Sequence, residues 1–209
     1  MINITKEAIK KMDHLPRLTL INSITGYKPA NLIGTANSQG KTNLAIISSI
    51  VHLGSDPALI GFMMRPMVSE RHTMENILET KFYTINHLHR DIAERGHFTS
   101  ADFDRDTSEF ERCGLTPWFL DGFSAPFVKE SRIGIGMSFA EKIDIKLNGV
   151  ILVMGYVEHI YMEDHYLNDD QSIDLHKAGT ICISGLDRYN DVHEFAQYPY
   201  ATPANTPKF

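Results

Sequence analysis

The chain has 209 residues, of which 43% are hydrophobic and 22% charged, and its formal net charge is −6 at pH 7. This composition is typical of a globular protein and argues against a disordered or fibrous one. Nucleic-acid binding needs a basic surface, which the net negative charge does not favour. No apolar run approaches the ~20 residues that span a bilayer. We therefore expect neither a nucleic-acid nor a membrane partner.

The sequence predicts a single domain in a reducing compartment. It contains no long linker, low-complexity block or internal repeat, which predicts one domain over residues 1–209. The two cysteines, Cys113 and Cys182, could form one disulfide, but two thiols fit a reducing compartment at least as well. The N-terminus has no basic segment followed by a long apolar run, so no signal peptide is expected. The predicted location is the cytoplasm.

Strand patterns dominate the first half of the chain. Apolar, β-branched runs between turn-forming clusters predict strands over residues 30–36, 43–53 and 58–64. Because these runs lie close together, we expect a meander rather than strand–helix–strand units. Thr73 can cap a short helix that runs to Thr80.

Further strands are expected in the rest of the chain. Residues 81–88 return to a strand pattern, and short helices are predicted over 90–95 and 108–112. Alternating residues predict strands over 133–139 and 143–147. The pair Asn148-Gly149 then predicts a hairpin turn in which both residues have positive φ. Many short antiparallel strands with a few helices indicate a mainly β protein with a barrel architecture.

Two polar clusters are candidate binding residues. Asn43, Ser48 and Ser49 interrupt apolar strands, where they could hydrogen-bond to the edge of a planar heterocycle. The alternative is that Asn43 closes a turn and the serines fill tight packing positions. Arg71, His72 and Thr73 at a helix start could form an anion site, or simply a solvent-facing helix cap.

The sequence gives little support for a metalloenzyme or a Ser–His–Asp hydrolase. His87 and His89 would share a face of a strand, and His97 follows, but no cysteine pair or His-Glu-x-x-His motif accompanies them. We therefore predict no metal site. The chain also lacks the Gly-x-Ser-x-Gly elbow of Ser–His–Asp hydrolases.

Several segments in a fixed order resemble the flavin-reductase-like, FMN-binding split-barrel family, close to its flavoredoxin-type branch. The first are the strand 43–49, the turn 55–57, the helix start 72–77 and the strand 82–86. The later ones are Phe110-Glu111-Arg112-Cys113-Gly114-Leu115 and Gly155-Tyr156-Val157. Each motif is short and degenerate, and together they cover most of residues 30–160.

The resemblance implies a Greek-key split β-barrel that forms a homodimer and holds FMN at or near the subunit interface. It also implies cofactor-binding roles for eight residues: Asn43, Ser48 and Ser49 at the isoalloxazine and ribityl groups; Arg71, His72 and Thr73 at the phosphate, with Arg65 a weaker candidate; and Asn86 along the cofactor. The implied activity is flavin reduction by NAD(P)H or electron transfer to another acceptor. Hydride transfer to flavin needs no protein nucleophile or base, so no catalytic residue is predicted.

One segment departs from the family pattern. Reductases of this family often carry Gly-Asp-His shortly before the motif that Gly155-Tyr156-Val157 matches, but this chain reads Asn148-Gly149-Val150 there. The change puts rapid NAD(P)H turnover in doubt without weakening the case for flavin binding. It favours one alternative function, a non-catalytic flavin-binding or carrier protein. A split barrel that binds another ligand, such as haem or a deazaflavin, is the second alternative.

Overall fold

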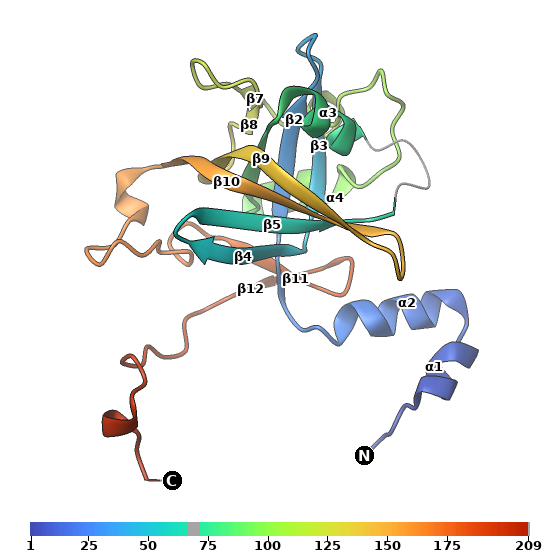
Figure 1. Ribbon diagram of the computed structural model, residues 1–209, viewed down its shortest axis with the longest axis vertical. Coiled ribbons are helices and arrows are strands. Elements are labelled where there is room, and N and C mark those ends of the chain that lie inside the picture. Colours follow the sequence, from blue (N-terminus) through green and yellow to red (C-terminus); the bar gives the residue numbers. More distant parts are fainter. Residues whose placement is uncertain (67–71, 209) are drawn as a thin grey trace.

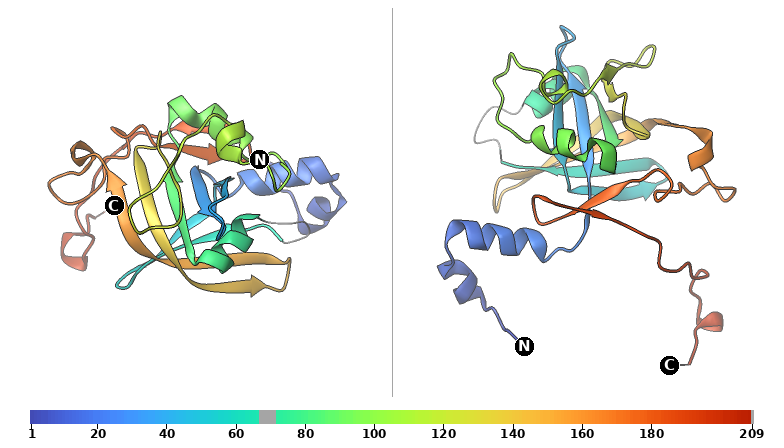
Figure 2. Two further views of the ribbon diagram at one scale, coloured as in Figure 1. Left: turned by 90° about the horizontal axis from the view of Figure 1, so that it is seen from above. Right: turned by 180° about the vertical axis from the view of Figure 1, so that it is seen from behind.

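The computed structural model describes residues 1–66 and 72–208, and most of its strands belong to one antiparallel sheet (Figure 1). Seen from above, this sheet curls round into a barrel (Figure 2). Its strand order is β3-β2-β6-β9-β10-β5-β4. The bounds are β2 Asn31–Ala36, β3 Thr42–Ile47, β4 Ile50–Ser55, β5 Ala58–Met64, β6 Phe82–His87, β9 Ile133–Ile145 and β10 Val150–Met162. The predicted mainly β fold, an antiparallel barrel, is confirmed.

Smaller elements surround the barrel. A three-stranded sheet joins β1 (Lys28–Pro29), β11 (Ile181–Ser184) and β12 (Arg188–Asp191), and β7 (Pro117–Trp118) pairs with β8 (Phe127–Val128). The helices are α1 Lys6–Lys11, α2 His14–Ser23, α3 His72–Thr80, α4 Ala93–Phe98 and α5 Glu109–Arg112, with 3₁₀ turns at Arg90–Ile92, Asp164–Tyr166 and Pro203–Asn205. Among the described residues, no helix is long and apolar enough to cross a membrane.

The barrel is split between two strands that are consecutive in the chain. β3 pairs with β2 and β4 pairs with β5, yet β3 and β4 lie at opposite edges of the sheet. The single strand expected over residues 43–53 is therefore wrong, and so is the expected meander. Ser48 and Ser49 stand outside both strands, at the corner where the chain passes from one edge to the other.

The hairpin predicted at Asn148-Gly149 is present, but its turn differs from the expected type. β9 and β10 pair from Ile145 opposite Val150 onward, so four residues form the turn. Only Gly149 has positive φ, at 75°, while the Asn148 side chain accepts a hydrogen bond from the Val150 N–H at 3.2 Å. The longer turn needs left-handed backbone at one position instead of two.

Helix α3 closes one end of the barrel. Met74 and Ile77 are fully buried and pack with Phe62 and Tyr83 in the barrel core, whereas Leu78 is 38% exposed. The helix includes His72, so Thr73 lies in its first turn and is not the capping residue that the sequence predicted. The first turn of α3 therefore places polar residues of this helix beside β3.

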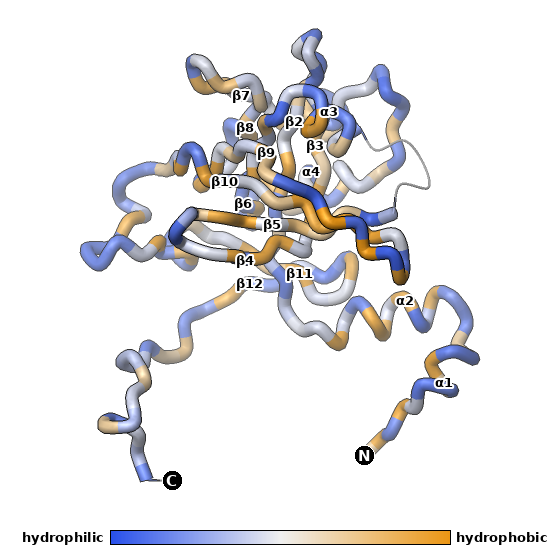
Figure 3. Tube along the Cα trace, viewed as in Figure 1, coloured by the Kyte–Doolittle hydropathy of each residue, from blue (hydrophilic) through white to orange (hydrophobic). Residues whose placement is uncertain are grey.

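The outward face of β4, β5 and β10 is apolar as well as the inward one. Phe62, Ile151 and Val153 point into the core, while their neighbours along the strands point outward. The exposed apolar residues on this outward face include Val51 at 39%, Leu53 at 40%, Met63 at 37% and Tyr156 at 45%. Figure 3 shows apolar segments along β4 and β5. We call these four residues the outer face; a strand that is apolar on both faces usually has both covered.

Candidate functional site

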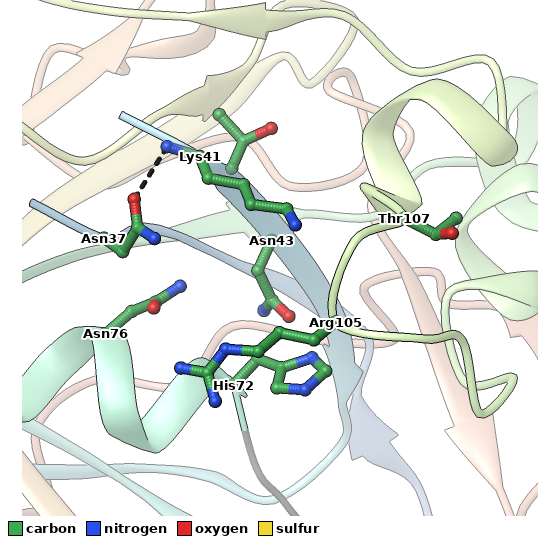
Figure 4. Close-up of a pocket in the computed structure, with 8 residues that line it drawn as sticks. Asn37, Lys41, Asn43, His72, Asn76, Arg105 and Thr107 are labelled. Atoms are coloured by element: carbon green, nitrogen blue, oxygen red, sulfur yellow. Dashed lines mark hydrogen bonds between the residues drawn. The ribbon is translucent and has the colours of Figure 1, made fainter. Parts of the chain in front are cut away.

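A polar pocket lies where the β2–β3 hairpin, the start of α3 and the loop before α5 meet. Three segments that are far apart in the sequence each contribute one basic side chain to it: Lys41, His72 and Arg105. The remaining lining residues are Asn37, Thr42, Asn43, Asn76 and Thr107. Figure 4 shows the side chains of Lys41, Asn43, His72 and Arg105 directed toward the same space. Amides, hydroxyls and cations in one hollow are the donor set that an anion requires.

A buried hydrogen-bonded network forms the floor of this pocket. The Asn43 Nδ2 donates to Thr73 Oγ1 at 2.9 Å and to Thr35 Oγ1 at 3.4 Å. The Asn76 Nδ2 donates to Thr35 Oγ1 at 3.1 Å, and none of these four residues is more than 7% exposed. Because each amide is anchored to a strand or helix neighbour, the polar groups at the floor are fixed before any ligand arrives.

The cations at the rim are held by acidic partners. The Lys41 Nζ lies 2.6 Å from Asp106, whose side chain is 99% exposed, and this contact lowers the pKa of Asp106. The Arg105 Nη2 lies 2.7 Å from Glu75 Oε2. Ion pairs at such partly exposed positions contribute little to stability, and their consequence here is to hold the two cations in place at the rim.

The start of α3 adds a second source of positive potential. The first N–H groups of a helix have no partner within the helix, and the helix dipole favours negative charge there. Thr73 in the first turn accepts from Asn43, which leaves its hydroxyl hydrogen able to donate to a ligand. The arrangement can bind a phosphate through backbone, hydroxyl and basic groups together.

A buried carboxylate lies next to the pocket. Glu109 is 7% exposed and its Oε2 accepts from the Leu44 N–H on β3 at 2.9 Å. Burial raises the pKa of Glu109, while the hydrogen bond from Leu44 and the charge of His72 oppose that shift. Glu109 thereby ties α5 to β3, immediately after Asn43.

The structure brings some of the predicted site residues together and separates others. Asn43, His72 and Thr73 meet at the pocket. Ser48 and Ser49 lie beyond the other end of β3, where the Ser49 hydroxyl donates to the Met63 carbonyl at 2.9 Å. Asn43 thus lies with His72 and Thr73, two of the residues predicted to bind the phosphate, and not with the two serines.

The remaining predicted residues lie elsewhere or outside the described part of the chain. Arg65 is exposed and directly follows β5. Asn86 is fully buried, and its amide is occupied by the Leu32 carbonyl at 3.1 Å, the Thr84 hydroxyl at 2.8 Å and the Val128 N–H at 3.0 Å. Arg71 lies outside the described residues, so its role stays a prediction.

Two basic residues of the pocket were missed by sequence reasoning. Lys41 follows the hairpin turn at Gly40, and a lysine after a turn is usually a solvated surface residue. Arg105 comes from a loop more than sixty residues further along the chain, so no spacing rule connects it with Asn43. Only the packing of that loop against the β2–β3 hairpin makes the two residues neighbours.

The β9–β10 turn, where Asn148-Gly149-Val150 departs from the family pattern, lies against the end of β5. A Cβ added at Gly149 would be 3.3 Å from the Cβ of Pro66, the residue after Arg65. The altered turn is therefore close to Arg65, a candidate cofactor residue.

The histidines and cysteines have separate surroundings. His87 Nδ1 faces Thr180 Oγ1 at 3.5 Å, His89 Nε2 faces the Glu130 carbonyl at 2.9 Å, and His97 Nδ1 faces Tyr189 Oη at 2.9 Å. In the part of the chain that the structure describes, no three His, Cys, Asp or Glu side chains gather as metal ligands. Cys113 and Cys182 are both buried free thiols.

The fold and the pocket define a split-barrel protein with a preformed polar pocket that carries basic side chains. Residues 27–181 match the family described as the flavin reductase like domain, and the chain belongs to that family. A split-barrel protein of the flavin-reductase type from Shewanella frigidimarina is 45% identical, with a TM-score of 0.93 over 96% of this chain and 100% of its own.

Two more distant structures share the fold. Nitrilotriacetate monooxygenase component B from Bacillus cereus is 19% identical, with a TM-score of 0.83 over 95% of this chain and 98% of its own. Flavoredoxin from Desulfovibrio vulgaris is 20% identical, with a TM-score of 0.74 over 84% of this chain and 92% of its own. The resemblance inferred from the sequence motifs is thereby confirmed.

Proposed function

We propose that this protein binds FMN and acts as a flavin-dependent oxidoreductase, with the FMN phosphate in the pocket at the start of α3. The observation that carries the proposal is the fixed contact of Asn43 with Thr73 beneath Lys41, His72 and Arg105. A doubly charged phosphate suits a site with several basic groups and a helix start, whereas riboflavin has no phosphate to place there.

The rest of the cofactor would follow β3 toward Ser48 and Ser49. Ser49 follows Asn43 by six positions, which corresponds to about 20 Å of extended chain. FMN is an elongated molecule with its phosphate at one end and its ring system at the other. We therefore place Asn43 at the phosphate end and the two serines toward the isoalloxazine, with Arg71 and Arg65 as further candidates for the phosphate.

The bound flavin would supply the redox chemistry by accepting and donating hydride or electrons. The residues of the chain bind and orient it, and none is required as nucleophile or general base. The proposed activity is flavin reduction by NAD(P)H, or electron transfer from the flavin to another acceptor. A non-catalytic flavin carrier is the second candidate function, because Asn148-Gly149-Val150 replaces the family's Gly-Asp-His at the turn beside Pro66.

We further propose a homodimer in the cytoplasm. The outer face of Val51, Leu53, Met63 and Tyr156 is uncovered in a single chain, and β4 is an edge strand with unpaired backbone groups. A second copy would cover both, with an obligate interface of more than about 2,000 Å². The two free thiols fit a reducing compartment.

The absorption spectrum of the purified protein tests the cofactor. We expect a yellow protein with close to one FMN per chain. A preparation that stays colourless after incubation with excess FMN would contradict the proposal, and a haem or deazaflavin spectrum would support the other ligand class. Stopped-flow reduction with NADH and with NADPH then separates an oxidoreductase from a non-catalytic carrier. The flavin of a carrier should be reduced by either nucleotide far more slowly than the flavin of a reductase.

A further inference from the structure

The two ends of the chain form extensions that the barrel does not cover. Residues 1–26 carry α1 and α2, and residues 192–208 contain little more than one 3₁₀ turn. Figures 1 and 2 show both segments projecting from the same side of the barrel. No residue of α1 or α2 is buried. We call these two segments the arms.

The N-terminal arm has the composition of a helix that packs against something. Helices of six and ten residues are marginal on their own, because isolated helices shorter than ~12–15 residues are barely stable in water. At 100° per residue, the apolar residues of α2 point in all directions: Leu15, Leu18, Leu20 and Ile21. Leu15 is 70% exposed and Ile21 is 41% exposed, so apolar surface of this helix faces water. The arm therefore needs a surface that its own barrel does not supply.

The C-terminal arm shows the same mismatch between composition and exposure. Phe195 is 93% exposed, Tyr198 is 77% exposed and Tyr200 is 89% exposed. Three aromatic side chains within six residues represent a large apolar area in contact with water. Aromatic residues of this kind are enriched at protein–protein interfaces and dominate their binding energy.

Charge and size indicate what covers the arms. Residues 1–26 carry four Lys and Arg against two Asp and Glu, whereas the remaining residues carry 16 against 24. A positive arm is thus complementary to the negative barrel of another copy. The arms comprise 26 and 17 residues, comparable to the 20–30 residues that each side of a stable interface supplies.

We propose that the arms are exchanged between two copies of this chain, each copy's arms packing on the barrel of the other. The proposal rests on the homodimer proposed above and names the segments that hold it together. A twofold axis makes the exchange reciprocal, so both barrels are clasped by identical contacts. The outer face and the arms then become buried in a single association step.

Photo-crosslinking in the full-length, FMN-loaded protein tests the exchange. p-Benzoylphenylalanine replaces Leu15 in one sample and Tyr198 in another, and replaces Ser100, an exposed loop residue after α4, in the control. On a denaturing gel we expect the first two samples to give a covalent product of twice the 23.6 kDa chain mass, and the control to give none. Crosslinks confined to single chains, or none in a protein that light scattering shows to be dimeric, would overturn the proposal.

A second experiment measures the strength of the arm contact. The double variant Leu15→Glu with Ile21→Glu is compared with Ser100→Glu and Ala101→Glu, which adds the same charge at exposed positions. We expect the dimer dissociation constant to rise at least tenfold in the first variant and to stay unchanged in the second. Equal constants in both would refute the exchange. The flavin absorbance of each sample reports cofactor binding separately, so failure of the arms is distinguishable from failure of the FMN proposal.

Discussion

Two networks of buried amides lie a few strands apart in the barrel, and they differ in what they leave available. The network of Asn43 and Asn76 is fixed through Thr35 and Thr73 and opens onto a pocket with basic side chains. The network of Asn86 is closed: both amide hydrogens and the carbonyl oxygen are bonded to the protein. We call them the open network and the closed network.

The closed network attaches a loop to the sheet. The Thr84 hydroxyl donates to the Pro126 carbonyl at 2.6 Å, and Asn86 accepts from Val128 two residues later. The loop approaches so closely that a Cβ added at Gly34 would lie 2.2 Å from the Pro126 oxygen. An asparagine on a barrel strand therefore serves either ligand binding or architecture, depending on whether its polar atoms are already used.

The largest effect is expected at the closed network. Asn86→Ala removes three hydrogen bonds and leaves the Leu32 carbonyl and the Val128 N–H buried without that partner. Each unsatisfied buried group costs roughly 1–3 kcal/mol, so the free energy of unfolding should fall by about 3 kcal/mol or more. Urea denaturation measures the loss.

FMN titration of the same variant distinguishes a structural role of Asn86 from a cofactor-binding role. The folded Asn86→Ala protein should bind FMN with nearly unchanged affinity if the network is structural. A large loss of FMN affinity with unchanged unfolding free energy would show that Asn86 lies along the cofactor, as the family resemblance implies.

The next effect concerns the open network. Arg105→Ala removes a guanidinium from the pocket, and a charge-assisted contact with phosphate is worth roughly 1.5–3 kcal/mol. FMN binding should weaken by about 10- to 150-fold, while riboflavin, without a phosphate, should bind as before. Fluorescence titration with both flavins makes the comparison.

Arg71→Ala and Arg65→Ala provide the matched variants for this experiment. From the sequence we expect Arg71→Ala to behave like Arg105→Ala. Equal weakening of FMN and riboflavin in any of them would mean that the arginine supports the pocket generally. If only Arg65→Ala discriminates between the flavins, the phosphate lies near the β9–β10 turn and not at the start of α3.

A pH effect is expected next to the closed network, at the end of β6. Burial lowers the pKa of His87 to about 4, below the ordinary value of about 6.5 in an unfolded chain. The unfolded state therefore binds more protons below pH 6.5, and stability contributed by neutral His87 is lost as the pH falls from 6.5 toward 4. Linkage gives a loss of about 2 kcal/mol between pH 8 and pH 5.

Unfolding of the wild type and of His87→Gln at both pH values measures this contribution. The variant cannot take up that proton, so its loss of stability on acidification should be smaller by about that 2 kcal/mol. Identical pH profiles for the two proteins would show that His87 titrates normally in the folded state.

The smallest effect should come from the hydroxyl of Thr73. Thr73→Val keeps the shape of the side chain but removes the acceptor that Asn43 uses, which costs about 1 kcal/mol of stability. Since Thr73 lies within the first turn of α3, this loss reflects the link to β3 and not a helix cap. Thr73→Ser should retain both stability and FMN affinity; a loss equal to that of Thr73→Val would assign the effect to packing.

The sequence by itself determined the local elements and the kind of fold. The run 58–64 forms β5 with the predicted bounds, and the hairpin at Asn148-Gly149 occurs where its turn residues indicate. A helix also begins close to Thr73, although Thr73 lies in its first turn and does not cap it. These features depend on residues that are near one another in the chain, so their chemistry can be read from spacing.

Tertiary structure decided what depends on distant segments. The strand expected over 43–53 breaks at Ser48 and Ser49 because barrel closure sends β3 and β4 to opposite edges of the sheet. Arg105 reaches the pocket only through the packing of its loop, and Asn86 is occupied only because the loop ending at Val128 lies over it. Hydrogen-bond satisfaction and burial are properties of the assembled fold. Strand periodicity therefore does not predict which asparagine amide remains available to a ligand.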